Sequence, residues 1–247
     1  MRTYFLKQDK KAAGKTIKFI YLIPTFQNPT GVTLETERRR RVVELARDYD
    51  VLIIEDDPYG ELRYVGERVP SLKSFDSDGH VIYLSTFSKI FSPGARMGWV
   101  IAHEQVIKKL VYLKESVDLH SSTLVQALVY EYCRRGHLDP HIQEIIPLYA
   151  VRRQAMLDAM EEYFPSDVTW TRPDGGFFLW VTLPKYMDTR KMFPKAAEHN
   201  VTYVPGYAFF PEGSGQNTMR LSFSATNEDQ IHEGVKRLAE VIQSNRA

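Results

Sequence analysis

The chain has 247 residues, a formal net charge of +1 and a hydrophobic fraction of 43%. This length suffices for one large or two small domains with a sizeable core, and the near-neutral charge gives no indication of a nucleic-acid or anionic membrane partner. The single cysteine, Cys133, excludes an intramolecular disulfide and a cysteine-rich metal site, so no metal is expected. Neither a signal peptide nor an apolar run of about 18 residues is present, which predicts a cytoplasmic protein without a membrane span.

The first half of the chain predicts an α/β sheet. Residues 1–16 are polar and are expected to form a helix, and residues 18–23 read as a buried strand. Apolar residues recur at helical spacing through 34–49, and the continuous run 51–54 is typical of a strand covered on both faces. The runs 81–84 and 97–102 predict two more strands. Short links indicate a mixed sheet in which the run 97–102 is antiparallel.

The second half of the chain predicts long helices followed by an α+β domain. Helical periodicity runs from residue 104 to 136, with one amphipathic face predicted at Val125, Leu128, Val129 and Tyr132, and continues through 142–160. Residues 168–170 and 177–183 flank a Pro-Asp-Gly-Gly turn and predict a hairpin. A helix around 190–199, strand-like pieces at 202–204 and 219–223, and a final helix opened by Asn227 follow. We therefore expect two domains, 1–138 and 139–247, the second a small α+β domain that begins in a long bridging helix.

The stretch Ser85–Trp99 carries the strongest chemical signal. Lys89 follows directly after a predicted strand, where its amine can react with a carbonyl compound. Thr86, Ser88 and Arg96 add two hydroxyls and a guanidinium, a set suited to a phosphate group. An amine beside a phosphate site is what pyridoxal phosphate requires, although a short match such as Thr-Phe-Ser-Lys also occurs by chance in many loops.

Three other residues each admit an ordinary structural explanation and a chemical one. Asn28, in Asn-Pro-Thr-Gly, is a good turn former, and its amide can also donate to a phenolate oxygen. Asp56 ends a buried strand and needs a partner, which a helix N-terminus, an arginine or a pyridine nitrogen could supply. Arg220 lies in a predicted strand of alternating polar and apolar residues. Its side chain could be solvent-exposed there, or it could bind a carboxylate through two of its N–H groups.

These motifs, with Gly175–Trp180 and Tyr203–Gly206, stand in the order found in fold-type I pyridoxal-phosphate enzymes, and the chain resembles the class I/II aminotransferases over nearly its whole length. The resemblance implies a three-layer fold with a mostly parallel sheet, incomplete here. It also implies that Asp56 rather than Asp57 contacts the ring nitrogen, because Asp56 stands three residues before Tyr59. It assigns Lys89 as the catalytic residue, cofactor binding to Asn28, Asp56, Tyr59, Thr86, Ser88, Lys89 and Arg96, and substrate binding to Asn28 and Arg220.

The segments FQNPTGVTL and EDDPYGEL resemble most the branch of 2-aminoadipate, kynurenine and aromatic aminotransferases. This implies exchange of an amino group between an L-amino acid of the 2-aminoadipate, aromatic or branched-chain type and a 2-oxo acid, and a homodimer in the full-length form. Members carry well over a hundred residues before the Asn-Pro-Thr-Gly strand, so we expect a carboxyl-terminal portion with impaired activity. Two alternatives stay open: a pyridoxal-phosphate lyase, and the cofactor-sensing domain of a transcriptional regulator.

Overall fold

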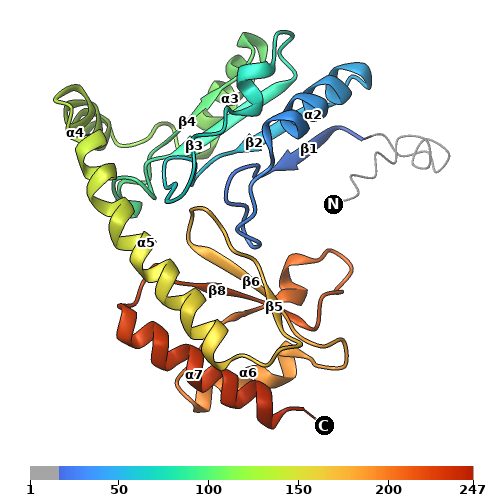
Figure 1. The fold of residues 1–247 in the computed structure, drawn as a ribbon. Helices are drawn as coiled ribbons and strands as arrows, with labels where there is room; N and C mark the ends of the chain where they lie inside the picture. Colours follow the sequence, from blue (N-terminus) through green and yellow to red (C-terminus); the bar gives the residue numbers. More distant parts are fainter. Residues whose placement is uncertain (1–16, 247) are drawn as a thin grey trace. The chain divides into compact units, whose positions relative to one another are not determined.

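The computed structural model describes residues 17–246, which form two compact units (Figure 1). The described residues of unit 1 fall within Met1–Pro24, Leu34–Pro58 and Val69–Arg135, and those of unit 2 fall within Thr25–Thr33, Tyr59–Arg68 and Gly136–Ala247. Two short segments from the first half of the chain thus belong to unit 2. The helix expected at 1–16 lies outside the described residues, and the domain boundary expected at 138/139 stays a prediction.

Unit 1 is built on a four-stranded sheet in the order β1-β2-β3-β4. The strands are β1 (Phe19–Leu22), β2 (Leu52–Asp56), β3 (Val81–Thr86) and β4 (Gly98–Ile101). The first three are parallel, and β4 is antiparallel to β3. The predicted mixed sheet with its antiparallel fourth member is therefore confirmed.

Helix α2 (Thr36–Asp48) covers one face of this sheet, together with the short 3₁₀ helix η1 (Leu72–Phe75). The helix begins close to the residue predicted from the helical spacing of its apolar side chains. Buried side chains from the helices and the strands form the core of unit 1: Val43, Ala46, Ile53, Leu72 and Val81. On the opposite face Phe19 and Tyr21 of β1 stay half exposed. Because side chains alternate along a strand, Asp56 and Thr86 lie on this second face.

Three further helical segments of unit 1 follow β3: η2 (Pro93–Ala95), α3 (Glu104–Val117) and α4 (Thr123–Arg134). Helix α3 buries none of its residues, and α4 buries only Val129. The amphipathic helix predicted there is confirmed by α4. Much of its apolar face is not covered, and Leu128 is 58% exposed.

Unit 2 contains an antiparallel sheet in the order β5-β6-β8-β7 with helices on one side. Its elements are α5 (Leu138–Tyr163), β5 (Thr169–Trp170), β6 (Phe178–Thr182), α6 (Thr189–Glu198), β7 (Val204–Pro205), η3 (Gly206–Phe209), β8 (Thr218–Ser222) and α7 (Glu228–Ser244). The predicted hairpin is confirmed by the pairing of β5 with β6. The strand expected at 202–204 is shifted, because pairing with β8 begins only at Val204.

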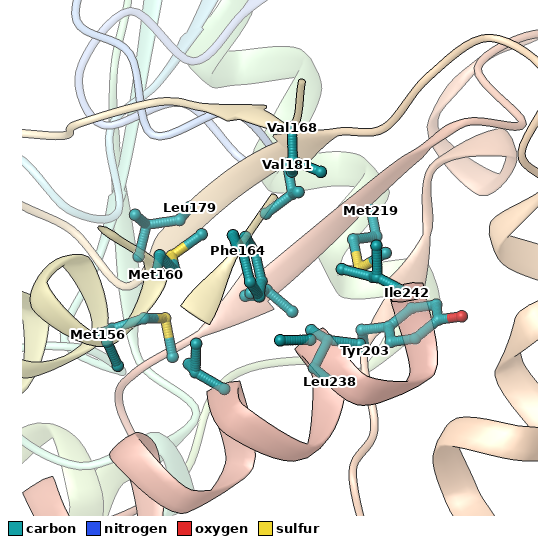
Figure 2. Close-up of a cluster of buried hydrophobic side chains, with 14 of the residues drawn as sticks. Met156, Met160, Phe164, Val168, Leu179, Val181, Tyr203, Met219, Leu238 and Ile242 are labelled. Atoms are coloured by element: carbon teal, nitrogen blue, oxygen red, sulfur yellow. The ribbon is translucent and has the colours of Figure 1, made fainter. Parts of the chain in front are cut away.

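The core of unit 2 lies between its sheet and the helices α5 and α7, which run side by side in Figure 1. Figure 2 shows the facing side chains: Met156 and Met160 from α5, Leu179 and Val181 from β6, and Leu238 and Ile242 from α7. Fully burying one such side chain contributes about 1.5–3 kcal/mol. This core therefore holds β6 and β8 in fixed register. None of the helices in residues 17–246 combines the length and apolar character that a membrane span requires.

Candidate active site

Strands β2 and β3 of unit 1 run parallel and end in polar residues at the same edge of the sheet. Asp56 is the last residue of β2, and Thr86 is the last residue of β3. The hydroxyl of Tyr21, on the neighbouring strand β1, donates to Oδ2 of Asp56. In open α/β sheets ligands bind at the carboxyl ends of the strands. The edge of the sheet thus carries the Asp56 carboxylate and the Thr86 hydroxyl at the position where such a site is expected.

The two acidic neighbours of Asp56 have different surroundings. Glu55 is fully buried and accepts hydrogen bonds from the backbone N–H groups of Leu72 and Lys73 at 2.7 and 2.8 Å. Burial raises the pKa of Glu55, and these two backbone hydrogen bonds offset part of the rise. Asp57 accepts from the Tyr83 hydroxyl at 3.2 Å, and its N–H donates to the Leu84 carbonyl. Glu55 and Asp57 are therefore tied into the fold of unit 1.

The turn after β3 places the predicted phosphate ligands and the lysine. The Thr86 hydroxyl lies 2.9 Å from Ser88 Oγ and 2.9 Å from the Met97 carbonyl oxygen, and it accepts from the Ser88 N–H at 3.1 Å. Lys89 is half-buried in this turn. Within residues 17–246 its side-chain nitrogen forms no hydrogen bond or ion pair, so its N–H donors are available to a ligand.

Arg96 follows η2 in the left-handed backbone conformation, with φ of 52°. Its guanidinium Nη1 lies 3.4 Å from the Pro93 carbonyl oxygen. The adjacent residue, Met97, binds both the Thr86 hydroxyl and the Phe87 N–H. The structure thus brings Thr86 and Ser88 together and ties the backbone beside Arg96 to them, without a recorded bond from the guanidinium to either hydroxyl in the described chain.

Unit 2 brings together three other predicted residues. Arg220, on β8, donates from Nη1 to Oδ1 of Asn28 at 2.7 Å. Its guanidinium lies 4.2 Å from the ring centre of Phe178 and 5.2 Å from that of Phe209. Burial lowers the pKa of Arg220, and the nearby Tyr59 opposes this shift. A charged group in such partly buried, aromatic surroundings is well suited to a carboxylate ligand.

Tyr59 is 5% exposed, and its ring packs edge-on against Phe177 and Phe178 at centroid distances of 5.7 and 5.8 Å. Both phenylalanines belong to the Gly-Gly-Phe-Phe stretch. Tyr59 therefore packs within unit 2, as Asn28 and Arg220 do.

Two sets of residues around these groups were not identified from the sequence. One is Tyr21, whose position on the strand next to Asp56 follows from the parallel register of β1 with β2. The other is the aromatic pair Phe178 and Phe209 around Arg220, which becomes visible only once β6 and β8 are paired. Period-two alternation could have placed Tyr21 on the face of Asp56, but no local pattern locates Phe209. In the described part of the chain no group of three or more His, Cys, Asp or Glu side chains could hold a metal ion.

The chain is similar to known proteins along almost its full length. The family described as aminotransferase class I and II matches residues 6–238. Aromatic-amino-acid aminotransferase 1 of Thermococcus litoralis is 52% identical over 236 residues, which are 96% of this chain and 57% of that protein. The crystal structure of Pyrococcus horikoshii kynurenine aminotransferase in complex with PMP is 46% identical with a TM-score of 0.96, and covers 100% of this chain and 62% of that one.

A relative of another kind is the uncharacterized HTH-type transcriptional regulator YisV of Bacillus subtilis, 34% identical over 92% of this chain and 46% of that protein. In each case the chain spans about half to three-fifths of the relative's length. The match to the family covers well over half of this chain, and the fold agrees with that of the solved relatives. The chain therefore belongs to the aminotransferase class I and II family.

Proposed function

We propose that this chain is the pyridoxal-phosphate-binding and substrate-binding part of an aminotransferase that acts on an aromatic L-amino acid and a 2-oxo acid. The observation that carries the proposal is the shared edge at which the parallel strands β2 and β3 end in Asp56 and in Thr86–Lys89. The family match and the names of the most similar relatives support it. Homologues also act on 2-aminoadipate and kynurenine, which remain the alternative substrates.

The donor set of unit 1 fits pyridoxal phosphate. The Lys89 amine can bond to its carbonyl carbon, Asp56 can hold a proton on its ring nitrogen, and Thr86, Ser88 and Arg96 can bind its phosphate. When bound, the cofactor supplies an electron sink for the substrate's Cα. With the cofactor bound, the Lys89 amine would accept the proton from the substrate's Cα and would deliver it to the cofactor carbon C4′, so that no proton is gained or lost.

Unit 2 supplies the proposed carboxylate site. Arg220 binds the substrate's α-carboxylate through donors that its bond to Asn28 does not use. Asn28 and Tyr59 would donate to the cofactor's phenolate oxygen, and the rings of Phe178 and Phe209 would shield the Arg220 guanidinium from part of the solvent. We further propose a cytoplasmic homodimer without nucleic-acid or membrane partners, and a domain division of the chain near residue 138.

The second candidate function is the cofactor-sensing domain of a transcriptional regulator, and the similarity to an HTH-type regulator favours it. Both functions use the same cofactor residues, so cofactor binding alone does not separate them. Turnover by the full-length form separates them: an aminotransferase converts an aromatic amino acid and 2-oxoglutarate to a new amino acid and a new 2-oxo acid, and a sensor does not. Release of ammonia would instead indicate a lyase.

The test of the proposal is covalent labelling. The chain is incubated with pyridoxal phosphate, reduced with borohydride and digested, and the modified peptide is mapped by mass spectrometry. We expect the label on Lys89, because its amine has no competing partner among the described residues. The Lys89→Arg variant should lose this label, whereas Lys109→Arg, on the exposed surface of α3, should keep it. A label that stays on another lysine while Lys89 is unmodified would refute the assignment.

A further inference from the structure

Phe26 occupies an unusual position two residues before Asn28. Its side chain is fully buried, and its backbone has a φ of 49°. A non-glycine residue rarely adopts this left-handed region, and it does so where its surroundings fix it. The Arg63 guanidinium lies 4.7 Å from the centre of the Phe26 ring. Packing around the ring therefore determines the backbone at the start of the loop that carries Asn28.

Two consecutive glycines form the surface against which Phe26 packs. A Cβ placed on Gly175 would lie 2.3 Å from Cζ of Phe26 and 2.3 Å from the Leu62 carbonyl oxygen. A Cβ on Gly176 would lie 2.6 Å from Cβ of Phe26. Real Cβ atoms do not approach other heavy atoms this closely, so only hydrogen atoms fit at both positions. The phenylalanine ring and the glycine backbone are thus in direct contact.

Hydrogen bonds join the segment 62–64 to the segment 174–176 beside Phe26. The Gly176 N–H donates to the Leu62 carbonyl at 2.9 Å, and the Tyr64 N–H donates to the Asp174 carbonyl at 2.7 Å. Farther along the loop, Gly31 lies so close to the Phe178 carbonyl that an added Cβ would be 2.5 Å from it. Residues 26–31 are therefore held at both ends against the segment 173–178, all within unit 2.

The loop is also rigid between these two ends. The Gln27 side-chain oxygen accepts from the Thr30 N–H at 2.8 Å, and the Gln27 N–H donates to the Val32 carbonyl at 2.9 Å. Displacement of Phe26 would therefore move Asn28 with it. Since Asn28 Oδ1 accepts from Arg220 Nη1 at 2.7 Å, such a shift would also change the orientation of the guanidinium.

We propose that Phe26, Gly175 and Gly176 form a positioning element, here called the Phe26 latch, that fixes the Asn28 amide against Arg220 and so sets the direction in which Arg220 binds a carboxylate. Phe26 is a positioning residue and contacts no substrate. The effect on carboxylate binding rests on the proposed function of Arg220. The effect on the Asn28–Arg220 hydrogen bond does not, since it concerns residues of this chain alone.

The experiment compares Gly176→Ala with Gly136→Ala. Both glycines have left-handed backbones, with φ of 71° and 72°, but a Cβ on Gly136 would meet no atom within 4 Å. The backbone cost of alanine is thus matched, and only the contact with Phe26 differs. The first readout is the side-chain amide resonance of Asn28 in a ¹H–¹⁵N spectrum, assigned by its loss in Asn28→Asp. The second is the affinity for 3-phenylpropanoate, an unreactive aromatic monocarboxylate, by calorimetry.

We expect Gly176→Ala to shift the Asn28 resonance and to weaken binding about tenfold or more, and Gly136→Ala to leave both unchanged. If Gly176→Ala does not fold, Phe26→Leu provides the same test, because it removes the ring and keeps an apolar side chain. A folded variant of either kind with the wild-type Asn28 resonance would overturn the latch.

The Arg220→Lys variant separates this result from the proposed function. If Arg220→Lys binds 3-phenylpropanoate as well as the wild type does, or if the wild type does not bind it, the carboxylate role of Arg220 fails. The Asn28 resonance then still tests the latch. A general loss of stability would change many resonances, so a shift of the Asn28 resonance in an otherwise unchanged spectrum reports a local change.

Discussion

Asp56 and Asp57 are neighbours in sequence but face different partners. Asp56 is bound by the Tyr21 hydroxyl on the second face of the sheet, whereas Asp57 is tied to Tyr83 and to the Leu84 backbone. In the full-length form expected from the sequence, and given the proposed role of Asp56, we expect Asp56→Ala to lower turnover at least about 100-fold, because the ring nitrogen would lose its ionic partner. Asp57→Ala should keep most of the activity. Aminotransferase assays on both variants, together with the absorbance of the bound cofactor, provide the measurement. The opposite pattern would show that Asp57, and not Asp56, contacts the ring nitrogen.

Glu55 makes the stability of unit 1 depend on pH. Burial raises its pKa above the ordinary value of 4.5, so the folded chain binds the proton more tightly than the unfolded chain does. The stabilising contribution of the protonated form is complete below the unfolded pKa and is lost as pH rises through the folded pKa. The wild-type free energy of unfolding should therefore fall with rising pH relative to that of Glu55→Gln, whose side chain does not titrate.

Urea unfolding from about pH 4 to pH 7 measures this difference. Glu115→Gln, on the exposed face of α3, serves as the control and should run parallel to the wild type. Parallel curves for Glu55→Gln and the wild type would contradict the predicted effect of burial.

At the scale of the element, α7 is fixed by its first turn and by its apolar face. Asn227 accepts from the Gln230 N–H at 2.9 Å, and the Gln230 side chain accepts from the Asn227 N–H, which completes a capping box. Asn227→Ala should lower the free energy of unfolding by about 1 kcal/mol, since it leaves helix donors unpaired. Lys236→Ala, exposed in the middle of the same helix, should change it by less than about 0.5 kcal/mol. Equal effects of the two variants in urea unfolding would refute the contribution of the cap.

At the scale of the whole molecule, the apolar side chains of α3 stand out. Leu113 is 61% exposed and Val117 is 84% exposed. Exposed apolar faces of this kind favour association. We expect concentration-dependent self-association in sedimentation velocity, reduced in the double variant Leu113→Lys/Val117→Lys. Ser116→Lys adds positive charge to the same helix without removing apolar surface and should not reduce association. A chain that stays monomeric at all concentrations would show that this surface does not drive self-association.

The sequence by itself determined the order of the elements and placed several candidate site residues at the ends of strands. Helical and strand periodicity are local, so α2, β2, β6 and α7 could be located from the spacing of their apolar residues. The capping box of α7 needs only residues three apart, and Thr86, Ser88 and Lys89 lie within one turn. The parallel strands and the position of Asp56 at a strand end followed from the same local patterns.

The tertiary structure alone decided which distant residues meet. Asn28 and Arg220 are 192 positions apart, and their hydrogen bond depends on the packing of Phe26 against Gly175 and Gly176. The sequence also predicted an amphipathic helix at α4, and the structure buries only Val129 of that helix. Periodicity shows which face of a helix is apolar, but burial depends on whether another element covers that face. Such contacts arise from the path of the whole chain, and no local spacing encodes them.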